Sequence, residues 1–229
     1  MRRALIALLI FLGSTTSALA AVSVNIGINL PVYPRLVRVP GYPVYYAPSV
    51  NSNYFFYDGL YWVFNGDNWY ESRWYNGPWV AVEPDYVPLY VLRVPVRYYR
   101  NPPVYFRGWR ADYAPRWGDR WGNTWEQRHT GWDRWDRKSA PVAAPLPTYQ
   151  RQYSGNRYPQ QLEQQTTLHS QGYRYQPRDA VVQQRYQQQA QVAPAPAPQP
   201  QQRGQGQERG QDRGNRGDRG DRGKGNQRE

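Results

Sequence analysis

The sequence predicts a mainly β protein: a small antiparallel, aromatic-rich meander, one amphipathic Trp/Arg helix and a long disordered C-terminal tail. Three observations lead to this prediction. Aromatic runs alternate with Asp-Gly and Asn-Gly pairs at residues 54–82, tryptophans recur at helical spacing at 116–137, and residues 139–229 contain neither Trp nor Phe. We therefore divide the 229-residue chain into a signal peptide (1–20), a small β domain (21–110), a Trp/Arg-rich amphipathic segment (111–138) and the tail (139–229).

The first 20 residues have the three parts of a secretory signal peptide. Arg2 and Arg3 precede an apolar stretch at residues 4–12, and Ala18-Leu19-Ala20 forms a small-residue cleavage site. That apolar stretch is about half of the roughly 20 residues that a transmembrane helix needs, so we expect cleavage rather than anchoring. The mature protein is then expected to begin at Ala21 and to be periplasmic or extracellular.

The β domain is expected to begin with a strand at residues 22–30, because apolar and polar residues alternate there without a break. Residues 31–48 contain five prolines among tyrosines. Proline fixes φ and removes a hydrogen-bond donor, so this stretch is expected to wrap around the domain in an extended form rather than to pair fully.

Residues 54–82 carry the strongest turn signals. Asp58-Gly59, Asn65-Gly66-Asp67 and Asn76-Gly77 separate four short aromatic runs. Such pairs favour two-residue hairpin turns because they tolerate positive φ. We therefore expect four short antiparallel strands joined by tight turns.

Two further elements complete the expected ordered part. Residues 89–99 alternate apolar and polar side chains, with Pro95 on the polar side, and predict a fifth strand at an edge or a bulge. At helical spacing, the tryptophans of residues 116–137 fall within an arc of about 80°, which predicts one amphipathic helix. This helix could dock on the sheet or lie in a membrane interface, and we favour docking because its net charge is small.

The tail changes in composition at residue 139. It is rich in Gln and Pro and ends in Arg-Gly pairs at residues 203–223. The tail has too little apolar surface to offset the entropy cost of ordering. We therefore expect disorder, with a transient helix at residues 180–192.

The composition provides few of the residues that catalytic or metal sites use. The chain has no Cys, and its two histidines, His129 and His169, lie in polar sequence far apart. We therefore expect no thiol chemistry, no metal site and no cofactor. Glu83 and Asp85 could serve as the paired acids of a hydrolase. Two acids in one loop are common on surfaces, so we expect a non-catalytic protein.

A ligand surface is the remaining functional hypothesis. Arg outnumbers Lys and the formal net charge is +12. Guanidinium groups pair with carboxylate and phosphate, and aromatic rings stack on sugars. The alternatives are that the tryptophans form the core and that the arginines form a solvated face. The candidate ligand surface consists of Trp62, Trp69, Trp74, Trp79, Arg93, Arg97, Arg100, Arg107 and Arg110.

Several motifs resemble those of uncharacterised exported Trp/Tyr-rich envelope proteins of Gram-negative proteobacteria. They are Y-D-G-L-Y-W at 57–62, V-P-V-R-Y-Y-R-N-P-P at 94–103, F-R-G-W-R at 106–110 and G-W-D-R-W at 131–135. The resemblance covers about residues 22–190. It implies a periplasmic or envelope location and transfers no catalytic residue.

The functional expectation is therefore a non-catalytic envelope protein whose partner is an anionic component or a polysaccharide. The alternative is a binder of nucleic acid or another acidic polymer that acts through the Arg-Gly tail. Peripheral contact with a membrane is compatible with both, and the oligomeric state is left open.

Overall fold

The computed structural model describes residues 23–191. The expected signal peptide and the Arg-Gly pairs at 203–223 therefore lie outside the described residues.

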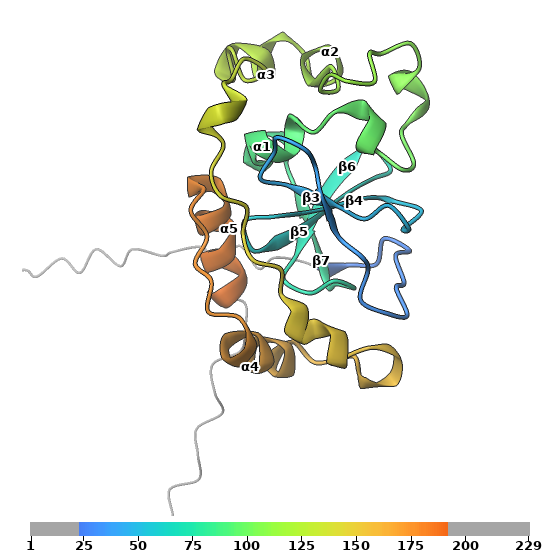
Figure 1. Ribbon diagram of the computed structural model, residues 1–229, viewed down its shortest axis with the longest axis vertical. Helices are drawn as coiled ribbons and strands as arrows, with labels where there is room; N and C mark the ends of the chain where they lie inside the picture. The colour runs from blue at the N-terminus through green and yellow to red at the C-terminus, as the bar shows by residue number, and fades with distance from the viewer. Residues whose placement is uncertain (1–22, 192–229) are drawn as a thin grey trace, which may run out of the picture. The chain divides into compact units, whose positions relative to one another are not determined.

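A seven-stranded antiparallel sheet forms the centre of the described chain (Figure 1), with strand order β1-β7-β6-β5-β4-β3-β2. This confirms the expected antiparallel, aromatic-rich sheet. Helical segments nevertheless contain more residues than strands, so "mainly β" describes only part of the fold. The strands are β1 (Ser23–Val24), β2 (Val37–Arg38), β3 (Tyr45–Tyr46), β4 (Asn53–Tyr57), β5 (Leu60–Asn65), β6 (Asn68–Ser72) and β7 (Trp79–Val82).

Two of the three expected hairpin turns form as the sequence predicts. Asp58 and Gly59 connect β4 to β5 with φ of 49° and 95°, and Gly66 and Asp67 connect β5 to β6 with φ of 54° and 65°. Positive φ at both central residues matches the twist of the paired strands. The third turn differs, because β6 ends at Ser72 and β7 begins only at Trp79. Residues 73–78 form a wider connection.

Both faces of the sheet are buried. Along β5, Trp62 and Phe64 belong to one apolar cluster, whereas Tyr61 and Val63 belong to a second cluster. Side chains of a strand alternate between the two faces, so each cluster lies on its own face. The chain therefore has to supply a cover for each face.

The first face is covered by segments that follow the sheet in the sequence. The chain there forms η1 (Pro84–Tyr86), α1 (Leu89–Leu92), η2 (Val96–Tyr98), η3 (Val104–Phe106), α2 (Trp117–Trp121), α3 (Asn123–Arg128) and η4 (Arg137–Ser139). Buried residues of α1, η3, α2 and α3 belong to the first cluster. The strand expected at residues 89–99 is wrong. Pro88 caps α1 and Pro95 caps η2, and the buried residues Val91, Leu92 and Val94 follow a helical turn.

The tryptophan segment docks on this face, as expected, but it is not one helix. Gly122 has φ of +84° and separates α2 from α3, and Trp132 lies beyond α3. Trp117, Trp125 and Trp132 are buried in the first cluster. A glycine at positive φ interrupts helical geometry, which explains why the continuous stripe predicted from the spacing breaks into two helices.

Residues 139–191 fold against the sheet, so the prediction of disorder from residue 139 is wrong for this part. They form η5 (Thr148–Gln152), η6 (Gly155–Arg157), α4 (Leu162–Gly172) and α5 (Ala180–Gln191). Val182 is buried in the first cluster, whereas the segment before it packs mainly on the second. Ala144, Leu146, Tyr149, Tyr158, Tyr173 and Tyr175 pack on the second cluster. These rings gain burial from an existing sheet face, which offsets the ordering entropy that the segment could not offset alone.

The strand expected at residues 22–30 is wrong beyond β1. Gly27 has φ of +72° and its backbone N–H bonds to Asn25, so the chain leaves the ladder there. The apolar alternation still sets burial, because Ile26, Ile28 and Leu30 pack on the second cluster. In residues 31–48, the short strands β2 and β3 extend the sheet between the prolines.

Candidate functional site

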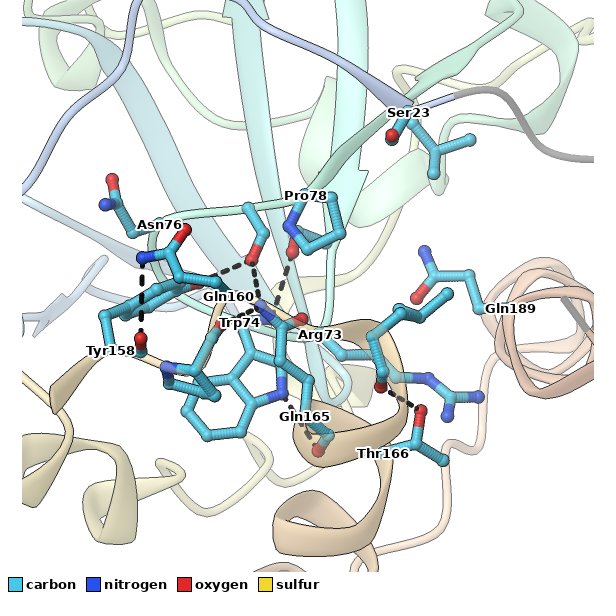
Figure 2. Close-up of a pocket in the computed structure, with 15 residues that line it drawn as sticks. Ser23, Arg73, Trp74, Asn76, Pro78, Tyr158, Gln160, Gln165, Thr166 and Gln189 are labelled. Atoms are coloured by element: carbon cyan, nitrogen blue, oxygen red, sulfur yellow. Dashed lines mark hydrogen bonds between the residues drawn. The ribbon is translucent and has the colours of Figure 1, made fainter. Parts of the chain in front are cut away.

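A pocket of about 410 Å³ lies where the wide connection at residues 73–78 meets the segment around α4 and the end of α5 (Figure 2). We call it the Arg73 pocket. Its lining combines amides and hydroxyls with apolar and aromatic groups: Ser23, Ser72, Arg73, Trp74, Asn76, Gly77, Pro78, Val80, Tyr158, Pro159, Gln160, Leu162, Gln165, Thr166 and Gln189.

The floor of the pocket depends on the backbone of residues 73–78. Gly77 has φ of +90°, and a Cβ at this position would lie 3.0 Å from the indole of Trp79. Only glycine adopts this backbone without strain and leaves the necessary space. Tyr158 donates a hydrogen bond to the Gly77 carbonyl, and the Trp74 indole N–H donates to the Gln165 carbonyl at 3.2 Å. These bonds join the floor to the wall formed by residues 158–166.

Arg73 is the single charged residue among the described residues that line the pocket. Its guanidinium lies 3.9 Å from the centre of the Tyr186 ring and donates to the Tyr186 carbonyl through Nη2. Its buried Nε has no hydrogen-bond partner within residues 23–191. Burial lowers the pKa of Arg73, yet arginine remains protonated in proteins. The pocket therefore holds one fixed positive charge.

A buried ion pair fixes α5 beside Arg73. Glu71 is completely buried on β6, and its Oε1 accepts from Arg185 Nε at 2.8 Å and from Gln189 Nε2 at 3.0 Å. Burial raises the pKa of Glu71, and the charge of Arg185 opposes that shift. Because Tyr186 also holds Arg73, strand β6 and helix α5 are joined by two adjacent polar contacts.

His169 lies next to Tyr186, the residue that also contacts Arg73. Its Nδ1 lies 2.8 Å from the Tyr149 hydroxyl, and its Nε2 is hydrogen-bonded to the Tyr186 hydroxyl. Burial, with a smaller contribution from the Arg73 charge, lowers the pKa of His169 from 6.5 to about 3. The imidazole is therefore neutral near pH 7, donates to one tyrosine and accepts from the other.

The depressed pKa of His169 predicts acid sensitivity. The folded state binds fewer protons than the unfolded state between pH 6.5 and about 3. The contribution of neutral His169 to the free energy of unfolding is therefore fully present above about pH 6.5. It decreases as the pH falls, by about 1.4 kcal/mol per pH unit. Urea unfolding at about pH 7 and about pH 5 measures this slope. His169→Gln should have a clearly smaller slope over this interval, and equal slopes would contradict the assignment.

The four predicted surface tryptophans are core residues. Trp62, Trp69, Trp74 and Trp79 are exposed by 0%, 1%, 1% and 3%, respectively. Their rings pack on other aromatic side chains, as in the contact of Trp69 with Phe64 at 5.2 Å between centroids. The structure thus corrects the interpretation of Trp62, Trp69 and Trp79 as a ligand surface, because both faces of the sheet are covered. Trp74, although only 1% exposed, lines the Arg73 pocket and is the one member of the predicted surface found in that lining.

The five predicted arginines have different environments. Arg93 is partly buried and donates to the Trp132 carbonyl, Arg97 is paired with Asp112, and Arg110 stacks on Tyr113 at 3.8 Å. Arg100 and Arg107 are exposed, and neither forms an ion pair with a described acid. The structure does not join these arginines and the tryptophans into one surface.

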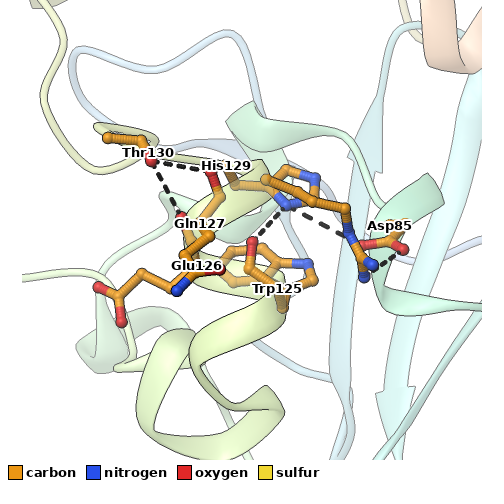
Figure 3. A network of polar contacts seen from close by, with 7 residues as sticks. Asp85, Trp125, Glu126, Gln127, His129 and Thr130 are labelled. Atoms are coloured by element: carbon orange, nitrogen blue, oxygen red, sulfur yellow. Dashed lines mark hydrogen bonds and ion pairs between the residues drawn. The ribbon is translucent and has the colours of Figure 1, made fainter.

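The two acids considered for hydrolysis have structural surroundings. Figure 3 shows Asp85 beside α3, where its Oδ2 accepts from Arg128 at 2.7 Å and its Oδ1 lies 3.9 Å from His129. Glu83 is exposed. Asp85 therefore joins η1 to α3, and the described contacts do not pair it with Glu83.

Sequence reasoning selected only Trp74 from the lining of the Arg73 pocket and missed the pocket itself. Arg73, Gln165 and Gln189 come from three distant segments, and two of these lie in the stretch expected to be disordered. The available signal was an arginine between buried aromatic positions, directly after the alternating strand β6.

Comparisons with protein-family models, curated proteins and solved structures give no match. Within residues 23–191, no group of three or more His, Cys, Asp or Glu side chains is placed to hold a metal ion. No helix in that part of the chain has the length and apolarity needed to cross a membrane. The chemistry of the pocket therefore carries the functional proposal.

Proposed function

We propose that the chain is a non-catalytic, exported protein of the cell envelope that binds an anionic envelope component, an acidic glycan, in the Arg73 pocket. The observation that carries the proposal is the single buried guanidinium in a pocket whose other described polar groups are neutral. A guanidinium binds carboxylate with charge-assisted hydrogen bonds, and amides and hydroxyls suit the hydroxyl groups of a sugar.

The pocket chemistry supports binding more than catalysis. The described lining contains no Asp, Glu, His, Lys or Cys that could act as a general acid, a general base or a thiolate nucleophile. His169, the nearest imidazole in the network, is buried between two tyrosines and has a pKa far below neutrality. The volume of about 410 Å³ is within the range of small-ligand sites and suits one or two sugar rings.

Arg73→Gln should weaken binding of an oligosaccharide that contains glucuronic acid by roughly 10- to 100-fold, because one charge-assisted contact is lost. Isothermal titration of the mature protein measures the affinity. Arg157→Gln, which changes an exposed arginine outside the lining, is the matched control and should bind as the unchanged chain does. Equal affinity of Arg73→Gln and the unchanged chain would overturn the proposal.

The export part of the proposal has its own test. Ala18 and Ala20 are small residues at the offsets that signal peptidase requires. N-terminal sequencing of the protein from the periplasm or the medium should therefore begin at Ala21. An intact N-terminus in a membrane fraction would contradict export by cleavage.

A second candidate function rests on the tail. The Arg-Gly pairs at 203–223 are typical of segments that bind nucleic acid or another acidic polymer through charge and stacking. Asp212, Asp218 and Asp221 reduce the charge of this stretch. This candidate assigns the affinity to the tail rather than to Arg73, and comparing a variant of Arg73 with a variant of the tail arginines separates the two assignments.

A further inference from the structure

The contacts of Arg73 and Gln189 restrict which anion fits the pocket. Resting on the proposed function, we infer that the Arg73 pocket selects a hydroxylated carboxylic acid of the sugar-acid class, and that Gln189 is the residue that selects the hydroxyl. The inference depends on where the two side chains lie, on which atom of each amide remains free, and on what a ligand must then offer.

The fold places Gln189 beside Arg73. Glu71 and Arg73 are two residues apart at the end of β6, and Tyr186 and Gln189 are three residues apart on α5. Residues at this helical spacing share a face. Glu71 bonds Gln189 while Arg73 stacks on Tyr186, and both Arg73 and Gln189 line the pocket. Figure 2 shows the two side chains on the α5 side of the pocket.

The orientation of the Gln189 amide is determined by its partner. Glu71 Oε1 accepts from both Arg185 and Gln189. A carboxylate oxygen in this position has no proton to donate, so the amide NH₂ of Gln189 must face Glu71. The carbonyl Oε1 of Gln189 therefore remains as a hydrogen-bond acceptor.

Gln165 is fixed in the same way on the opposite wall. Its Nε2 donates to the Pro159 carbonyl at 2.8 Å, and a backbone carbonyl can only accept. Its Oε1 is therefore also left as an acceptor. Gln165 is buried, with 3% of its surface exposed, so this orientation is fixed in the folded chain.

Arg73 supplies the complementary positive charge. The Tyr186 ring and carbonyl fix the plane of its guanidinium, and the residue lines the pocket. The pocket thus offers one fixed cation and fixed acceptors on neutral amides. A carboxylate satisfies Arg73, but the acceptors of Gln189 and Gln165 need O–H groups from the ligand. Sulfate carries no proton to donate, and an unsubstituted carboxylic acid carries no hydroxyl, so neither satisfies both parts of the pocket.

Isothermal titration of the full mature chain with four ligands tests this inference. Glucuronate carries both the carboxylate and the hydroxyls, cyclohexanecarboxylate has a six-membered ring and the carboxylate without hydroxyls, methyl glucoside has hydroxyls without the charge, and sulfate has the charge without an O–H. We expect glucuronate to bind at least about tenfold more tightly than each of the others. In Gln189→Met, the advantage of glucuronate over cyclohexanecarboxylate should fall to less than about threefold.

The outcomes separate this inference from the proposed function. If cyclohexanecarboxylate or sulfate binds as tightly as glucuronate, the sugar-acid class is wrong while the anion site stands. If no anion binds, or methyl glucoside binds as tightly as glucuronate, the proposed function fails as well. If Gln189→Met weakens glucuronate and cyclohexanecarboxylate equally, Gln189 only positions α5. Gln184→Met, an exposed position on the same helix, is the matched control. The ligand comparison in the unchanged chain decides the class even if a variant fails to fold.

Discussion

Trp117→Ala should lower the free energy of unfolding by about 3–5 kcal/mol, the range for removing a fully buried large aromatic side chain. Trp117 has no exposed surface and its ring contacts Phe64 at 5.2 Å and Trp69 at 5.9 Å between centroids. Its indole N–H donates to the Leu92 carbonyl at 3.0 Å, so the variant also leaves a buried acceptor without its partner. Denaturant unfolding of the mature protein measures the loss.

Tyr113→Ala is the control for this prediction. Tyr113 belongs to the same segment between the sheet and η4 but is 54% exposed. Its replacement should change the stability by no more than about 0.5 kcal/mol. If Trp117→Ala keeps full stability but abolishes binding to liposomes, the tryptophan segment is a membrane anchor and its docking on the sheet is wrong.

Arg185→Ala should lower the free energy of unfolding by about 3–5 kcal/mol, because it leaves the carboxylate of Glu71 buried without its charge partner. Glu71 has no exposed surface, and the side chain of Arg185 is 15% exposed. Arg185 also donates to the Ala81 carbonyl on β7, so the variant weakens the contact of α5 with two strands. Thermal and denaturant unfolding measure the effect.

The matched control for Arg185 is Arg174→Ala, which removes an exposed arginine from the same part of the chain. It should change stability by no more than about 0.5 kcal/mol. Replacing both partners, with Glu71→Leu and Arg185→Met, should recover most of the loss because no buried charge is then left alone. A double variant as unstable as Arg185→Ala would show that the pair is not the cause of the effect.

Local rules were sufficient for the hairpins. Asp58-Gly59 and Gly66-Asp67 adopt positive φ because the turn requires it, and the strands beside them pair antiparallel as expected. Asp58 has a second role that no local rule predicts. Its carboxylate accepts from the backbone N–H groups of Arg178 and Asp179 at 2.8 Å each and so holds the start of α5 against the hairpin.

Long-range packing determined what the sequence could not predict. Residues 139–191 have too little apolar surface to fold alone, but Tyr149, Tyr158 and Tyr173 pack on a sheet face that needs a cover. Gln150 is fully buried because it bonds to Tyr61, to the backbone of Tyr75 and to the Arg73 carbonyl. A composition rule counts Gln as a polar residue in a tail and cannot anticipate these partners.

The candidate site could not be predicted from the sequence either, because it also depends on long-range packing. The Arg73 pocket exists because the connection at residues 73–78 is wider than the turn that Asn76-Gly77 predicts, and because two distant segments close it. Trp62, Trp69 and Trp79, which the sequence suggested as ligand residues, belong to the core, and only Trp74 also lines the pocket. Aromatic abundance therefore indicated how the sheet is packed rather than where the pocket lies.

The central claim is that the Arg73 pocket, and not the tail, binds the acidic glycan. The most direct test is to titrate an oligosaccharide that contains glucuronic acid into variants of Arg73 and of the tail. Three proteins are needed: the unchanged chain, Arg73→Gln, and a tail variant with glutamine in place of the arginines at 203, 209, 213, 216, 219 and 222. If the folded pocket binds the ligand, the tail variant should retain the affinity of the unchanged chain and Arg73→Gln should lose at least about tenfold. Loss of affinity in the tail variant with full affinity in Arg73→Gln would contradict the assignment and place binding in the Arg-Gly tail.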